Sequence, residues 1–526
     1  MPSQTKIKLL KSTAIVSSCT LLSRGLGFIR EMFMAYYFGT TLAKSAFDIA
    51  FLIPNLFRRV LGEGAFSAAF IPVYTEAIEK RSKDDADKMA SSVLAMLGCV
   101  LIVIVAAGIA VISVLQMSSD LGERASAVLP LLKIMLPYAF FICMVAGCIA
   151  VLNSVGRFAV PAISPVLLNV IWICVLAFIC KQFGDTPEER IYGVAWGVVA
   201  AGGIQLLLQA VAMAKNGFKA RINFDWKNEE MRKIMVLMGP AAIGMGVFQF
   251  NFLIDRLLAM YIAEWAPAAL TFSERLIYFP LGIFATALAT VLLPTFSQQA
   301  AGEEKKELLS TLSSSLKSIV LIMIPASVGV FVLARPLVEL VFERGVFTES
   351  STTLTARALW FYSPGLLVFS LHKVFVPAFY ALKDTVTPVR VAVKVVLINL
   401  ALNILFILTW PDGYRHSGLA FATVIASAVN SAMLGYYLNK KVGSPGWRSV
   451  FFTAMKAVLC AAIMGAVVFC AQQYGRQYAI AIGFSELLSL AVSIVGGIIC
   501  GVVVYLPAAF LLCRDDFRHL LKSIKA

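Results

Sequence analysis

The sequence predicts an all-α polytopic membrane protein, because its composition, the length of its apolar stretches and its loop charges all indicate that class. Of its 526 residues, 60% are hydrophobic and 14% are charged, and the mean hydropathy is +0.84. A soluble domain carries about 25% charged residues. The apolar stretches are roughly 20 residues long, which is the length that crosses a bilayer as a helix. They lack the alternation of a membrane β-barrel.

About fourteen apolar stretches are expected to span the membrane as helices, since a helix satisfies its own backbone polar groups inside lipid. The simplest division is into two pseudo-symmetric six-helix lobes, 1–227 and 228–440, followed by two C-terminal helices and a tail in 441–526. The predicted spans are 12–37, 42–76, 89–116, 128–153, 159–181, 191–214, 233–263, 267–299, 313–342, 354–382, 387–410, 416–438, 449–473 and 484–512.

Lysine and arginine gather in alternate loops, which fixes the expected orientation. Basic clusters precede the first span and follow the second, sixth and twelfth, whereas the intervening loops carry fewer. The positive-inside rule then places both termini in the cytoplasm. The net charge of +15 is explained by this topology, and without a basic soluble domain no nucleic-acid partner is expected. The ten cysteines sit singly in apolar spans and are expected to be buried hydrophobes rather than metal ligands.

Ionisable side chains inside the first two spans mark candidate functional positions, because burying such a group in lipid costs at least ~2.5 kcal/mol. The first span contains Arg24 and Arg30, and the second contains Asp48 and Arg58. Pro54, Gly62 and Gly64 predict that the second helix is broken, as transporter helices are near their substrates. The spacing also predicts an ion pair between Arg59 and Glu63, which are four residues apart.

Later spans add Arg275, and Lys373 beside His372, to this set. A single arginine near a span end often reaches the interface instead. A group of arginines inside spans favours binding, and guanidinium groups match phosphate oxygens in pairs. The excess of arginine therefore points to a diphosphate ligand and disfavours a cationic drug.

The two halves of the chain share weak internal similarity. The segment GAFSAAFIPVYTEA at 64–77 matches TALATVLLPTFSQQ at 286–299, with Pro72 and Pro294 coinciding. A second echo pairs Asn169 in VLLNV with Asn399 in VLINL. Repeated halves of this kind place a substrate between them and rock to give alternating access.

The run SRGLGFIRE, with AFDIAFLIPNLFRRVLGEGAFSAAFIPVY after it, resembles the signature of the bacterial lipid II flippases, the MurJ (MviN) family. The runs ERLIYFPLGIFATALATVLLP and PAFYALKDTVTP are similar to the same family, and the likeness covers the whole chain. The resemblance implies membership of the MOP exporter superfamily. It also implies transport of the undecaprenyl-diphosphate peptidoglycan precursor, lipid II, across the bacterial inner membrane.

The resemblance assigns roles to particular residues. It implies that Arg24, Arg30, Arg58 and Arg275 line a central cavity, with Glu63 at the acidic position before GAFS. Asp48 and Lys373 are further substrate-binding candidates from their place in the spans. The last two helices, within 449–512, are expected to contact the lipid tail. One position departs from the family pattern, because Tyr278 stands where some members carry an acidic residue.

The expected mechanism needs no organic cofactor and no catalytic residue. The arginines bind the diphosphate in an inward-open state, and this neutralisation favours rotation of the lobes outward, since a ligand shifts states that it binds differently. The membrane potential returns the empty cationic cavity, and coupling to Na⁺ or H⁺ is a further expectation. Oxygen ligands at Asp255, Asn399 and Asn403 suit a Na⁺ site; the alternative is an Asp255–Arg256 neighbourhood closed by hydrogen bonds. A monomer is expected.

Three other readings stay open. A flippase for another undecaprenyl-linked glycan shares the same physics and is disfavoured by the family motifs. A multidrug exporter of the same superfamily would need carboxylates and aromatic groups for cations. A membrane enzyme acting on prenyl diphosphates would need carboxylates for Mg²⁺, and the sequence has no aspartate-rich motif.

Overall fold

The computed structural model describes residues 2–60, 66–118, 121–221, 229–302, 305–514 and 516–517. In these ranges the secondary structure is helical, with no strand, which confirms the all-α prediction. The chain divides into two compact units, 1–268 and 269–526. The predicted lobe boundaries at 227 and 440 stay predictions.

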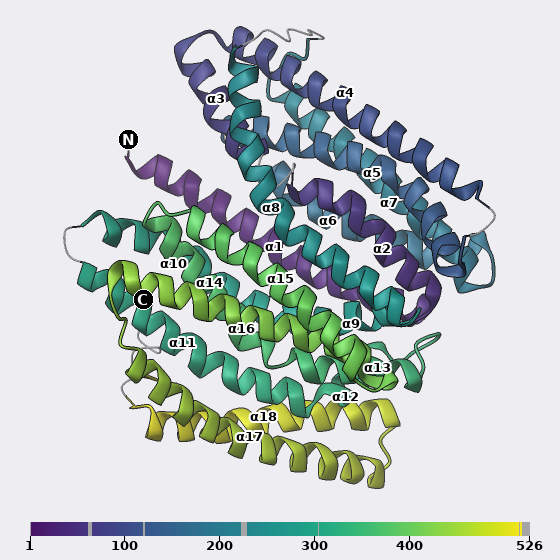
Figure 1. Cartoon of the computed structure of the whole chain (residues 1–526), viewed down its shortest axis with the longest axis vertical. Coiled ribbons are helices and arrows are strands. Elements are labelled where there is room, and N and C mark those ends of the chain that lie inside the picture. Colours follow the sequence, from purple (N-terminus) through teal and green to yellow (C-terminus); the bar gives the residue numbers. More distant parts are fainter. Residues whose placement is uncertain are drawn as a thin grey trace. The chain divides into compact units, whose positions relative to one another are not determined.

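The first unit is a bundle of long helices in which α5 is central (Figure 1). α5 packs against α2, α4 and α7, whereas α1 packs mainly along α6. Its core is rich in aromatic side chains, and the Trp172 ring meets Phe47 and Phe51 edge-on at 5.5 and 5.3 Å. The helices are α1 (Pro2–Phe38), α2 (Leu42–Phe57), α3 (Phe66–Lys80), α4 (Lys83–Gln116), α5 (Glu123–Ser154), α6 (Ala159–Cys174), α7 (Pro187–Lys215) and α8 (Glu229–Ile262).

Local sequence explains where several of these helices begin and end. α7 starts with a capping box, in which the Thr186 hydroxyl accepts from the Glu189 amide and the Glu189 carboxylate accepts from the Thr186 amide. Before it, α6 ends in a π-turn at Val175–Ile179 and a 3₁₀ turn at Cys180–Phe183. Gly184 then adopts a φ of +147°, a conformation that favours glycine.

The second predicted span begins with α2, which continues through Pro54 to Phe57 and is followed by a π-turn at residues 58–60. Gly62 and Gly64 lie outside the described residues, so the break expected there stays a prediction. Two later spans are bent: α9 (Ala266–Ile283) meets α10 (Ala285–Ala301) at 43°, and α13 (Glu349–Tyr362) meets α14 (Gly365–Ala381) at 47°.

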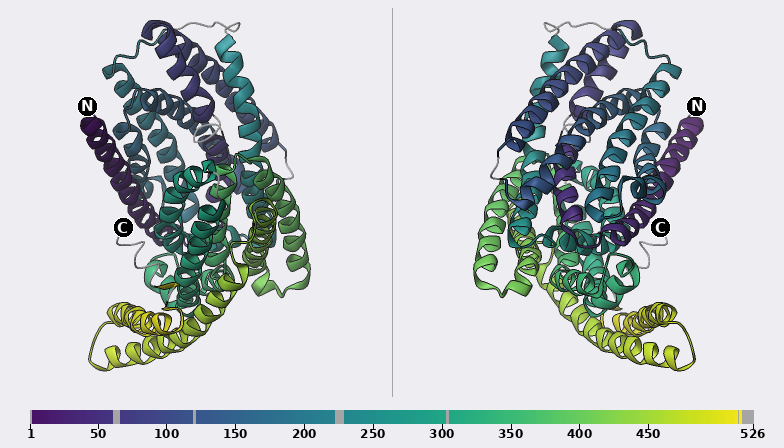
Figure 2. Two further views of the ribbon diagram at one scale, coloured as in Figure 1. Left: turned by 90° about the vertical axis from the view of Figure 1, so that its left-hand side faces the viewer. Right: turned by 90° about the vertical axis from the view of Figure 1, so that its right-hand side faces the viewer.

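The second unit combines these bent pairs with a long C-terminal hairpin. Figures 1 and 2 show α17 and α18 side by side at an edge of this unit, and α11 packs against α17. The Tyr505 hydroxyl donates to the Leu321 carbonyl at 2.7 Å, and Arg476 pairs with Glu339 at 2.7 Å. The remaining helices are α11 (Lys305–Val332), α12 (Ala334–Phe342), α15 (Val386–Thr409), α16 (Arg415–Val442), α17 (Trp447–Ala481) and α18 (Glu486–Leu512).

Many of the described helices are long and apolar enough to cross a bilayer. Nine meet this test alone, and there are up to eleven spans in the described residues if each bent pair counts as one. The chain is therefore a multi-pass membrane protein. The count of fourteen spans stays a prediction.

Candidate functional site

The clearest polar site of the first unit lies where α1 packs on α6. Ser23 and Arg30 are seven residues apart on α1, so they lie on one face of that helix. Asn169 and Trp172 are three apart on α6 and also share a face. We call these four residues, together with Glu31, the α1–α6 polar joint.

Arg30 is at the centre of this joint, with 9% of its surface exposed. Its Nη1 donates to Asn169 Oδ1 at 3.1 Å, and its Nη2 donates to Glu31 Oε1 at 2.6 Å. Its guanidinium carbon lies 4.2 Å from the centre of the Trp172 ring, a cation–π contact. Amide, carboxylate and indole together fix the orientation of the guanidinium.

The amide of Asn169 is itself held in place by α1. Its Nδ2 donates to the Ser23 carbonyl at 2.9 Å and to the Ser23 hydroxyl at 3.2 Å. These hydrogen bonds leave Oδ1 of Asn169 facing Arg30. The Asn169 side chain therefore connects Ser23 with Arg30. In the sequence, Asn169 stands out only through its similarity to the segment around Asn399, and its contact with Arg30 was not predicted.

The other predicted arginines of the first unit have different surroundings. Arg24 is exposed on α1, and Arg58 is partly buried in the π-turn after α2. Arg58 Nε donates to Asn55 Oδ1 at 2.8 Å, which holds it near its own helix. Thus Arg30 is a buried guanidinium with neighbours from a second helix, whereas Arg24 is open to its surroundings.

Asp48 is engaged by a residue that the sequence analysis overlooked. Lys44 Nζ contacts both carboxylate oxygens, at 2.6 Å for Oδ2, and Lys44 is 1% exposed. The spacing of four residues on a helix was a readable signal for this pair. Asp48 is therefore partly neutralised inside α2.

Glu63 lies outside the described residues, so its predicted pairing with Arg59 is untested. Arg59 Nη1 donates to Gln249 Oε1 on α8 at 3.1 Å. This contact ties the π-turn after α2 to α8 within the first unit.

In the second unit, Arg275 and Lys373 are both exposed, on α9 and α14. Beside Arg275, the Glu274 carboxylate accepts from the Tyr362 hydroxyl of α13 at 3.0 Å. The acidic neighbour of Arg275 is thus bonded to a different helix, in contrast to Glu31, which bonds to Arg30.

The candidate cation ligands fall in both units. In the first, Asp255 Oδ2 accepts from Asn251 Nδ2 at 3.3 Å, while Arg256 Nη1 lies 3.5 Å from the Pro267 carbonyl. In the second, Asn403 Nδ2 donates to Asn399 Oδ1 at 3.0 Å, and both asparagines are buried. Among the described residues, no group of three or more His, Cys, Asp or Glu could hold a metal ion.

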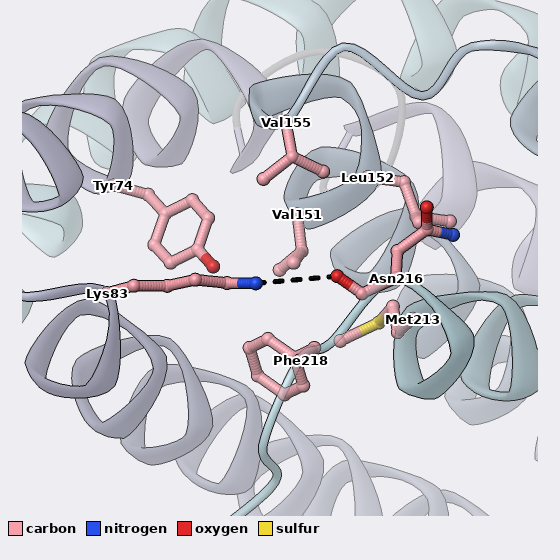
Figure 3. Close-up of a pocket in the computed structure, with 8 residues that line it drawn as sticks. All are labelled: Tyr74, Lys83, Val151, Leu152, Val155, Met213, Asn216 and Phe218. Carbon is pink, nitrogen blue, oxygen red and sulfur yellow. Dashed lines mark hydrogen bonds between the residues drawn. The ribbon is translucent and has the colours of Figure 1, made fainter.

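A small hollow lies among side chains of α3, α4, α5 and α7 (Figure 3). Its lining is mostly apolar, and Lys83 reaches across it to within 3.4 Å of the Asn216 carbonyl. Nearby, buried Asp87 accepts from the Tyr74 hydroxyl at 2.7 Å and from the Lys219 amide at 3.2 Å. These contacts fasten the turn after α7 to α3 and α4. The predicted arginines do not line this hollow.

The model of the family described as "Lipid II flippase MurJ" matches residues 34–508. The chain belongs to this family. A probable lipid II flippase MurJ of Rickettsia prowazekii is 32% identical over 520 residues, covering 98% of this chain and 100% of that protein. A Vibrio cholerae relative of the same description is 35% identical, covering 88% and 89%.

Solved structures agree with the family. A lipid II flippase MurJ in an inward closed conformation superposes with a TM-score of 0.76 at 25% identity, covering 95% of this chain and 99% of that one. An inward-facing multidrug-resistance MATE transporter of the MOP superfamily gives a TM-score of 0.66 at 14% identity, covering 81% and 94%. This second likeness shows a shared fold. The resemblance seen in the motifs is therefore confirmed, and the chain is a member of a transporter family.

Proposed function

We propose that this protein flips lipid II, the undecaprenyl-diphosphate-linked peptidoglycan precursor, from the inner to the outer leaflet of the bacterial cytoplasmic membrane. The observation that carries the proposal is the near full-length match to lipid II flippases. The α1–α6 polar joint supports it, because its central residue is a guanidinium, the group best matched to diphosphate oxygens.

Arg30 provides the anchor for the diphosphate in this proposal. Trp172 and Asn169 already hold its guanidinium, so little side-chain entropy remains to be lost when an anion binds. Arg24, Arg58 and Arg275 add positive charge for the same group. Glu63, Asp48 with its partner Lys44, and Lys373 complete the proposed substrate-binding set.

Transport then follows from differential binding. The bound diphosphate relieves repulsion among the arginines and so favours the state that opens outward. After release, an inside-negative membrane potential draws the cationic cavity back, because each charge that crosses the full field contributes ~2.3 kcal/mol per 100 mV. No covalent step and no organic cofactor is required, and the protein is proposed not to be an enzyme.

Coupling to a cation is a second part of the proposal. Asp255, Asn399 and Asn403 offer the oxygen ligands that a hard monovalent ion such as Na⁺ accepts. Proton coupling is the alternative. If transport in vesicles is the same with Na⁺ and with an impermeant organic cation, the Na⁺ part is wrong.

The remaining features follow from the membrane setting. Both termini are proposed to be cytoplasmic, given the basic loops. The working unit is proposed to be a monomer in the phospholipid bilayer, with lipid II as its partner. The tails of the substrate are proposed to contact the hairpin of α17 and α18.

The test replaces the flippase of a bacterium by this chain and measures the lipid II that is exposed on the outer face of the cytoplasmic membrane. We expect the intact chain to restore exposure and Arg30→Ala to fail. The matched control is Arg335→Ala, because Arg335 forms an exposed pair with Glu349, and such pairs contribute about 0–1 kcal/mol. That variant should transport normally.

The opposite results are equally informative. If the intact chain is inserted and stable but restores no exposure, the substrate assignment is wrong. A different undecaprenyl-linked glycan would then be tested in the same strain. Normal transport by Arg30→Ala would instead remove the guanidinium from the mechanism.

A further inference from the structure

The carboxylate of Glu31 is hydrogen-bonded to the Arg30 guanidinium, which is the group proposed to bind the diphosphate of the substrate. Glu31 Oε1 lies 2.6 Å from Arg30 Nη2, and Glu31 is 4% exposed. Arg30 and Glu31 are adjacent on α1, so the pair moves with one helix. A charge-assisted hydrogen bond of this length is among the strong contacts that proteins make.

Two neighbours on a second helix orient Arg30 without cancelling its charge. Asn169 and Trp172 are neutral, and both belong to α6 rather than α1. The guanidinium therefore stays oriented by α6 even when its carboxylate partner is exchanged for another oxyanion. Asn169 and Trp172 of α6 orient the Arg30 guanidinium, whereas Glu31 of α1 neutralises its charge.

We propose that Glu31 is a built-in counter-anion that occupies Arg30 in the empty protein and is displaced by the diphosphate of the substrate. This inference rests on the proposed function and deepens it by assigning a specificity role to Glu31. A buried guanidinium without an anion is costly, so the empty protein is stabilised by the carboxylate. Binding then becomes an exchange of one anion for another.

This exchange of anions on Arg30 affects both the affinity for the substrate and the rate of its release. The apparent affinity for the substrate is lowered by the fraction of protein in which Glu31 occupies Arg30. At the other side of the membrane, the returning carboxylate competes with the diphosphate and shortens its residence. A transporter gains from this, because a substrate that binds too tightly is not released.

The test compares Glu31→Gln with the intact chain, both purified whole in lipid nanodiscs. Glutamine has the same shape and can still accept from Arg30, but it carries no charge. We measure the affinity for lipid II and for farnesyl diphosphate, a shorter prenyl diphosphate. We expect about tenfold tighter binding of both, since close charge pairs couple by more than ~1.5 kcal/mol, together with slower transport in vesicles.

A second variant predicts the opposite direction. Asn169→Asp places a second carboxylate on Arg30; its other oxygen can accept from the Ser23 hydroxyl but loses the hydrogen bond to the Ser23 carbonyl. We expect about tenfold weaker binding of both probes, by the same charge coupling. The control Glu188→Gln makes the same chemical change at an exposed position at the start of α7 and should leave both affinities unchanged. In an Arg30→Ala background, Glu31→Gln should give no gain.

Structural damage alone does not tighten binding, so the gain is specific to the proposed role. Unchanged or weaker binding by a stably folded Glu31→Gln overturns the inference. If Glu31→Gln does not fold, binding by Asn169→Asp decides, and unchanged affinity there overturns it. If the intact chain binds farnesyl diphosphate but not lipid II, the substrate assignment fails, while tighter binding by Glu31→Gln still supports the exchange of anions.

Discussion

Asn169 in the first unit and Asn399 in the second occupy matching positions of the internal repeat, yet their surroundings differ. Asn169 bridges Ser23 and Arg30 of another helix, so both ends of its amide are used. Asn399 accepts from Asn403 on its own helix, and its Nδ2 finds no hydrogen-bond partner among the described residues. The Asn169 amide is hydrogen-bonded to a charged group, whereas the Asn399 amide has an N–H donor without a hydrogen-bond partner among the described residues.

The difference shows that two similar sequence segments can have different surroundings. A guanidinium beside Asn169 makes the first site suitable for anions. Asn399 Oδ1 instead accepts from a second neutral amide, that of Asn403, where Asn169 Oδ1 accepts from a guanidinium.

The largest effect is expected when the guanidinium is replaced but its charge is kept. Arg30→Lys retains one positive charge and loses the fork geometry and much of the stacking on Trp172. We expect transport of lipid II to fall by more than about tenfold, since charged hydrogen bonds contribute about 1.5–3 kcal/mol. Transport assays in vesicles measure this, and near-normal rates would show that charge alone is enough.

The next prediction compares the loss of stability when Asn169 or Asn399 is replaced by alanine. Asn169→Ala leaves the buried Arg30 without its amide acceptor and is expected to cost about 1.5–3 kcal/mol of unfolding free energy, whereas Asn399→Ala removes a neutral bond and costs about 0.5–1.5 kcal/mol. Thermal unfolding of both variants in detergent without Na⁺ gives the ranking. A larger loss for Asn399→Ala would reverse the comparison.

The effect of Na⁺ on thermal stability also distinguishes Asn169→Ala from Asn399→Ala. If Asn399 is an ion ligand, added Na⁺ should stabilise the intact chain and Asn169→Ala but should stabilise Asn399→Ala less, because a ligand stabilises only the state that binds it. Equal stabilisation of all three proteins would separate Asn399 from any Na⁺ site.

Sequence alone predicted the class of fold, and it drew attention to Arg30 as a candidate site residue. Apolar length and the absence of alternation were enough for a helical membrane protein. Arg30 was found because an ionisable residue inside a span is rare and costly. Pro54 did not end α2, which continues to Phe57, and the glycines expected to break the second span lie outside the described residues.

The partners of these residues were harder to predict. Trp172 and Asn169 lie about 140 residues from Arg30, and an apolar span gives no sign of which face meets α1. Glu31 is seven residues from Arg24 and so shares its helix face, yet the Glu31 carboxylate pairs with Arg30, one residue away. The Lys44–Asp48 pair, by contrast, was readable from its spacing.

A more conservative substitution tests the Trp172 ring, on which the Arg30 guanidinium stacks. Trp172→Phe keeps an aromatic face under the guanidinium but weakens the cation–π contact, for which tryptophan is the best partner, and about 0.5–1 kcal/mol of stabilisation should be lost. We expect a few-fold weaker affinity for a prenyl diphosphate in a binding assay. Trp410→Phe in the second unit, where the indole packs on Phe361 and Phe406, is the control. Equal loss of affinity in both would point to general loosening.

The smallest effect is expected at the exposed charged contact that precedes α15, the helix of Asn399. Burial opposes the charge of Asp384, but hydrogen bonds from Lys441 and from the Thr387 amide and hydroxyl outweigh it and lower the pKa of Asp384 to about 2. A lowered pKa means that the charged carboxylate favours the folded state. Its stabilisation is complete above the unfolded pKa of about 3.9 and is lost as the pH falls toward 2.

Asp384→Asn should therefore lower the unfolding temperature above about pH 4 and converge with the intact chain near pH 2. The effect should stay below about 1 kcal/mol, because the lysine partner is 40% exposed and screened by water. Unfolding temperatures from pH 6 to pH 2 measure it, with Asp412→Asn, which removes an exposed pair with Arg415, as the control. A loss as large as that of Asn169→Ala would mean that the second unit also depends on a fixed charge, and the contrast between the two units would no longer hold.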